Sequence, residues 1–130
     1  MYGNPATARA RYHTIDVGSQ VEAASPHRLI AILYEELLKQ FDTIVAGFNA
    51  GATANRPGMP ERRARANTIL MGLEGSLDRG QGGDLAQGLA AIYREARRLI
   101  REGMSQNDPK RIIQAREMIA EIADAWAAIG

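Results

Sequence analysis

The sequence predicts an all-α fold, an antiparallel up-down-up-down four-helix bundle preceded by a flexible N-terminal arm. Apolar residues recur every three or four positions in four separate segments, and every proline lies in a loop or at a helix start. No segment alternates apolar and polar residues for long enough to form a strand. The connections are mostly short, so consecutive helices are expected to pack antiparallel. We expect two parts, an arm over residues 1–24 and a bundle over residues 25–130.

The arm is predicted because its apolar residues follow no regular spacing. Residues 1–24 carry isolated apolar side chains, Tyr12 among them, between Gly, Asn, Thr, Ser and Arg. Chain ends of this kind are seldom ordered unless something ties them down. We therefore expect a flexible arm, with one short helical turn around residues 6–12.

The first two helices have recognisable starts and ends. Ser25 is a good N-cap, and Pro26 fits the first helical position because its missing N–H costs nothing there. The apolar face of this helix runs to Phe48, and a stretch rich in glycine and proline follows. Pro60 opens the second helix, and the glycines of residues 79–83 are expected to stop it.

The last two helices have start signals of the same kind. Asp84 is expected to cap the third helix, whose apolar side continues to Met104. Asp108 and Pro109 then mark the start of the fourth helix. Its apolar stripe ends near Trp126, which we expect to have a structural role.

Composition excludes several classes of protein. The chain has 130 residues, 16 basic against 15 acidic side chains, a net charge of +1 and no cysteine. This length suggests one domain, and the charge gives no field for nucleic acid or an anionic membrane. Thiol catalysis, zinc ribbons and disulfides are excluded. No apolar run is long enough to span a membrane, and the start lacks the apolar middle of a signal peptide, so we expect a cytoplasmic protein.

Catalytic and metal-binding motifs are missing from the sequence. Di-iron bundles use Glu-x-x-His pairs, and no glutamate here has a histidine three residues later. There is no Gly-x-Ser-x-Gly and no phosphate-binding glycine loop. We expect no enzyme, no metal and no cofactor. A phosphorelay bundle is the competing class, but His27 lies in the first helical turn and is expected to be a solvated helix-start residue.

Two surface patterns have alternative interpretations. Arg94, Arg97, Arg98 and Arg101 form a basic stripe, either a docking face for an acidic partner or nucleic acid or the solvated side of an amphipathic helix. We favour the solvated side, because no aromatic residues interleave as a stacking platform. The apolar stripes are also wide. They either bury more core or leave a groove for a segment of another protein.

A family resemblance bears on that choice. Residues 25–35, SPHRLIAILYE, resemble the first-helix signature of the FliS family, the flagellar export chaperones for flagellin. The resemblance continues in order through residues 75–78 and 82–86, Leu89, Tyr93 and residues 97–99, and then through residues 107–108 and 125–126. Tyr12 falls where the family carries a tyrosine in its arm. The sequence differs from the family pattern at Arg9, Glu36, Gly88 and Glu95.

The resemblance implies a cytosolic chaperone that uses no nucleotide and binds the disordered C-terminal segment of flagellin. It would prevent premature polymerisation and deliver its client to the flagellar type III export gate. Independently of the resemblance, we expect a monomer or weak homodimer that neither binds nucleic acid nor inserts into a membrane. Tyr12 is expected to be a movable lid over the client groove. The residues expected in that groove are Ile30, Leu33, Tyr34, Leu37, Leu77, Leu89, Ile92, Tyr93 and Ala96. A phosphorelay or structural adaptor bundle is the alternative.

Overall fold

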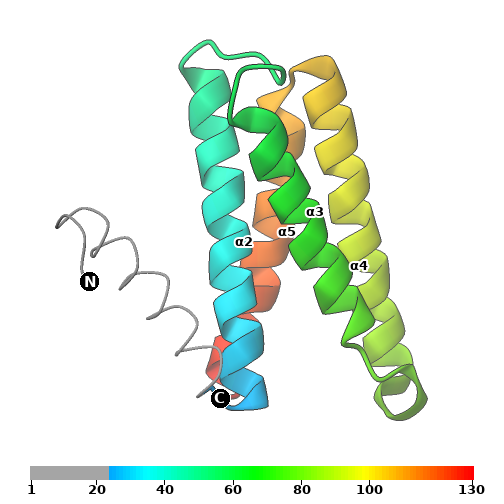
Figure 1. Cartoon of the computed structure of the whole chain (residues 1–130). Helices are drawn as coiled ribbons and strands as arrows, with labels where there is room; N and C mark the ends of the chain where they lie inside the picture. The colour runs from blue at the N-terminus through cyan, green and yellow to red at the C-terminus, as the bar shows by residue number, and fades with distance from the viewer. Residues whose placement is uncertain (1–23) are drawn as a thin grey trace, which may run out of the picture.

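The four predicted helices are present in the structure, a computed structural model that describes residues 24–130 (Figure 1). They are α2 (Pro26–Asn49), α3 (Met59–Gly75), α4 (Arg79–Gln106) and α5 (Pro109–Ala128), and the described residues contain no strand. Each helix packs on its two neighbours in the ring α2–α3–α4–α5. The prediction of an all-α antiparallel bundle is therefore confirmed. The predicted arm up to residue 23, with Tyr12 and the short turn at residues 6–12, lies outside the described residues.

The predicted caps start two of the helices. The Ser25 hydroxyl accepts a hydrogen bond from the backbone N–H of Arg28 at 3.1 Å, and Pro26 follows as the first residue of α2. Asp108 accepts from the backbone N–H of Lys110 at 3.0 Å at the start of α5. Each cap satisfies an N–H group that has no partner within its helix. The sequence signals for these starts are confirmed.

The start of the third predicted helix is wrong in position. Asp78, rather than Asp84, is the N-cap of α4, and it accepts a hydrogen bond from the backbone N–H of Gln81 at 3.0 Å. Residues 79–82 form a first helical turn, so this segment does not end α3, which already stops at Gly75. Gly83, with φ 54° and ψ −129°, interrupts the helix in a conformation that only glycine adopts readily. In Figure 1 the resulting turn stands off the axis of α4 at its lower end.

One end of the bundle is closed by contacts between its two connections. The Asn107 side-chain oxygen, in the turn from α4 to α5, accepts a hydrogen bond from the backbone N–H of Ala54 at 2.8 Å. Met59 lies against Gly47, where a Cβ atom would come within 2.9 Å of its sulfur. The core extends from this end along the helices, and its fully buried aliphatic and aromatic side chains include Phe41, Ile44, Leu70, Leu99, Ile100, Ile112 and Ile119.

At the opposite end, α2 and α3 diverge (Figure 1). A histidine–tryptophan pair joins α2 to α5 at this end. The Trp126 indole N–H donates to the His27 backbone carbonyl at 2.8 Å, and His27 Nε2 lies 2.8 Å from the Trp126 carbonyl. The two rings stack with centroids 4.5 Å apart. Trp126 is therefore structural, as expected. The expectation for His27 is wrong: its ring is half-buried against α5 rather than solvated, because the tryptophan provides both a stacking face and a carbonyl.

Candidate functional site

Five of the predicted groove residues form a half-buried apolar band at the divergent end of the bundle. Ile30 and Leu33 lie in the first turns of α2, and Leu89 and Ile92 lie in the first half of α4. Leu77 lies in the connection from α3 to α4. In an antiparallel bundle these three places share one end. All five side chains pack on the core with one side and keep part of their surface in solvent. We call this set the apolar band.

Leu77 is positioned by helix caps on both sides. Ser76, the C-cap of α3, donates its hydroxyl to the Leu73 carbonyl at 2.8 Å. Asp78, directly after Leu77, is the N-cap of α4. The Leu77 backbone N–H donates to the Glu74 carbonyl at 3.2 Å. The connection therefore holds the Leu77 side chain at a defined place in the band.

The other four predicted groove residues lie in the closed core. Tyr34 and Tyr93 are 2% exposed, and Leu37 and Ala96 are fully buried. The sequence predicts Tyr93 in the groove, but a buried tyrosine hydroxyl needs a partner, and the structure supplies that partner inside the core. The two tyrosine hydroxyls lie 2.6 Å apart. Burial raises the pKa of both hydroxyls, so both side chains stay neutral at physiological pH. These four residues belong to the buried core against which the apolar band packs, and we call them the floor.

Two exposed apolar residues extend the same end of the molecule. Leu85 is 72% exposed just after the break at Gly83, and Ile129 is 74% exposed just after α5. In the sequence both residues continue the helical spacing of apolar residues, and nothing in that spacing distinguishes them from core residues. The glycines before Leu85 are the only sequence signal that α4 leaves the bundle axis there.

Most charged side chains of the basic stripe are paired. Glu74 on α3 pairs with Arg97 at 2.7 Å and with Arg94 at 3.6 Å, which links α3 to α4. Arg98 pairs with Glu95 and Glu102 on its own helix. The hydrogen bond from Arg98 lowers the pKa of the Glu95 carboxyl. This part of the stripe therefore serves in the first place as a network of surface ion pairs.

The described residues offer no arrangement of metal ligands. Nowhere in residues 24–130 do three or more histidine or acidic side chains gather closely enough to hold a metal ion. Over the same range, no helix combines the length and the apolar character needed to span a membrane.

The chain matches known proteins over most of its length. Residues 8–130 match the family model described as "Flagellar protein FliS". The chain is 31% identical over 115 residues to the flagellar secretion chaperone FliS of Vibrio cholerae, a match that covers 88% of this chain and 82% of that protein. It is 29% identical over 129 residues to the flagellar secretion chaperone FliS of Salmonella typhimurium, covering 91% and 86%. It is 27% identical over 125 residues to the flagellar secretion chaperone FliSB of Pseudomonas aeruginosa, covering 94% of each chain.

Proposed function

Because this chain belongs to the FliS family of flagellar proteins, we propose that it is a cytosolic export chaperone for flagellin. It binds the disordered C-terminal segment of flagellin, prevents premature polymerisation and delivers its client to the flagellar type III export apparatus. The observation that carries this proposal is the match over residues 8–130, supported by relatives that are themselves named flagellar secretion chaperones. The protein acts by binding alone, without catalysis, metal or nucleotide.

The apolar band is the proposed contact surface for the client. A segment that is disordered alone must offset its ordering entropy by burying apolar surface when it folds on a partner. Ile30, Leu33, Leu77, Leu89 and Ile92 keep part of their surface in solvent at one end of the bundle. Exposed apolar side chains at Leu85 and Ile129 enlarge that surface. Such a surface suits a chain segment that alternates apolar anchors with polar residues.

The buried floor gives the band a fixed shape. Tyr34, Leu37, Tyr93 and Ala96 fill the space beneath it, and the hydrogen bond between the two tyrosines joins α2 to α4 across the bundle. A preformed surface loses little conformational freedom on binding, so the cost of ordering falls mainly on the client. We propose that these four residues support the client site from below and do not touch the client in this form of the bundle.

The proposal is tested by flagellin polymerisation. Purified monomeric flagellin is seeded and its assembly is followed by light scattering, with and without an equimolar amount of this protein. We expect assembly to stop when the protein is present at one-to-one stoichiometry. A flagellin that lacks its C-terminal segment serves as the binding control and is expected not to co-elute with the protein in gel filtration. Undiminished assembly at stoichiometric protein would contradict the proposed function.

A further inference from the structure

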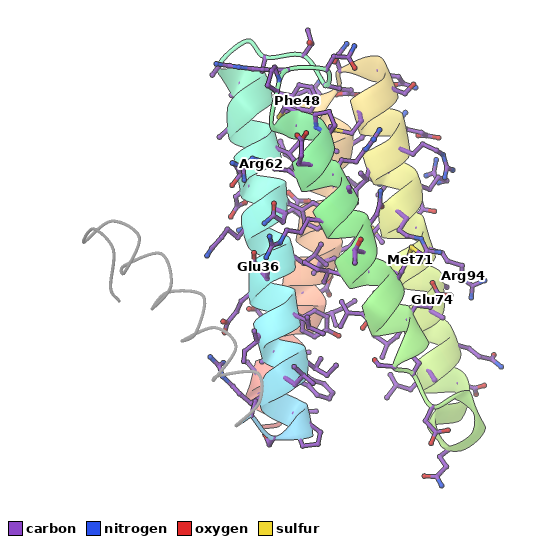
Figure 2. The ribbon with its side chains drawn as sticks, in the orientation of Figure 1. Glu36, Phe48, Arg62, Met71, Glu74 and Arg94 are labelled. Carbon is purple, nitrogen blue, oxygen red and sulfur yellow. The ribbon has the colours of Figure 1, made fainter. Side chains whose placement is uncertain are left out.

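A second groove lies between α3 and α4, and it shares no residue with the apolar band. It has a volume of about 760 Å³ and is bordered by the connection from α2 to α3. Three arginines line it, Arg63, Arg97 and Arg101, whereas no acidic side chain of residues 24–130 does. Its apolar lining includes Met71, which is 61% exposed on α3, close to Glu74 and Arg94 in Figure 2. The groove therefore combines positive charge with exposed apolar surface.

Two of the three arginines have no ionic partner in the described part of the chain. Arg63 and Arg101 are exposed, and no carboxylate of residues 24–130 forms an ion pair with either of them. Arg97 is held in place by Glu74 at 2.7 Å, which fixes its guanidinium at the wall of the groove. Unpaired guanidinium groups beside an apolar strip are complementary to carboxylates on an amphipathic partner. The basic stripe thus has a free part at this groove as well as a paired part.

The spacing of the lining residues matches a helix of two to three turns. Arg97 and Arg101 are one turn apart on α4, and Arg63, Asn67 and Met71 are spaced by four residues on α3. The lining runs from Pro60 to Met71 on α3, twelve residues or about 18 Å of helix, and from Arg97 to Ser105 on α4, nine residues or about 14 Å. A partner helix with carboxylates four residues apart would place both on one face, available to the unpaired guanidinium groups of Arg63 and Arg101. Its apolar residues would then lie against Met71.

We propose that the α3–α4 groove docks an acidic amphipathic helical segment of a second protein while the client occupies the apolar band. Nucleic acid fits this surface less well. The net charge of the whole chain is only +1, and the groove lining contains no aromatic residue on which a base could stack. The inference rests on the proposed function only for the presence of a client, since the docking itself is a property of the groove.

The test uses a defined peptide and charge-reversed variants. The probe is a capped, fluorescent peptide of about 14 residues with glutamate and leucine at helical spacing. Its control carries lysine in place of each glutamate. Fluorescence anisotropy is measured for the full chain, for the double variant Arg63→Glu with Arg101→Glu, and for Arg62→Glu, which changes an exposed arginine of α3 outside the groove. We expect the full chain to bind the acidic peptide saturably. The affinity should fall about tenfold or more in the double variant and should stay unchanged in Arg62→Glu.

Three results would overturn the inference. The first is equal affinity of the acidic peptide for the full chain and the double variant. The second is equal binding of the lysine peptide or of a single-stranded oligonucleotide. The third is displacement of the acidic peptide by excess flagellin C-terminal peptide, which would assign the groove to the client. If the flagellin peptide does not bind at all, the proposed function fails, while the comparison of the variants still decides the docking of the acidic helix.

Discussion

The hydrogen bond between Tyr34 and Tyr93 allows a quantitative test of which residues form the floor and which form the contact surface. Both side chains are 2% exposed and their hydroxyls lie 2.6 Å apart. Replacing one tyrosine by phenylalanine leaves the other hydroxyl buried without its partner, which costs about 1–3 kcal/mol. Replacing both leaves no unpaired hydroxyl, and such paired replacements are close to neutral. We therefore expect each single variant to be less stable than the double variant.

The assay is urea unfolding of the wild type, the two single variants and the double variant, followed by circular dichroism. Because each single loss of about 1–3 kcal/mol is absent from the double variant, the expected coupling free energy is about 2 kcal/mol or more in magnitude. In a parallel thermal melt, each single variant should melt several degrees below the double variant. Affinity for the flagellin peptide should stay the same in the double variant, because the hydroxyls face each other. Additive stability losses together with a weakened client affinity would refute the reasoning, since they would show that the hydroxyls point to the client.

Three further predictions concern the bundle itself. Trp126→Ala should lower the stability by about 2–4 kcal/mol, because the half-buried ring loses its stacking on His27 and its indole hydrogen bond, and a melting temperature shifted by less than about 2 °C would contradict this. Gly83→Ala should lower the free energy of unfolding by about 1–3 kcal/mol, because alanine is strained at the positive φ of this position. The matched change Gly88→Ala lies in open space inside α4 and should leave the stability unchanged or raise it. Equal melting temperatures of the two variants would exclude strain at the break. Burial raises the pKa of both core tyrosines, so the stability that they contribute is complete below about pH 10 and is lost as the pH rises further. Between about pH 9 and pH 11, the melting temperature of the wild type should therefore fall more than that of the double phenylalanine variant.

The sequence predicts the helices because their signals are local. Ser25 with Pro26 and Asp108 with Pro109 place a cap directly before a proline, and the structure confirms both starts. The start of α4 was missed because Asp78 precedes a run rich in glycine, a residue with poor helix propensity. Only the bundle as a whole decides that these residues form one turn before the break at Gly83.

The predicted groove residues fall into a half-buried set and a fully buried set for a different reason. Helical spacing identifies the face of a helix that packs into the bundle, but it does not say how far each side chain on that face is buried. Tyr34 and Tyr93 are 59 residues apart in the chain, and His27 and Trp126 are 99 apart. Contacts of that kind depend on the way four helices meet. These contacts determine that Tyr34 and Tyr93 are buried in the floor and that His27 packs on Trp126 instead of facing solvent.

The central claim is that a flagellin segment binds the apolar band. It is tested most directly by calorimetric titration of a flagellin C-terminal peptide into the wild type, Leu77→Glu and the control Ile113→Glu. Leu77 lies in the band between two helix caps, whereas Ile113 is 37% exposed on α5, near the closed end of the bundle. A thermal melt of each variant verifies folding. The account predicts one-to-one binding to the wild type, about tenfold or greater weakening in Leu77→Glu, and wild-type affinity in Ile113→Glu. Equal affinities in all three folded proteins, or no binding to the wild type, would contradict it.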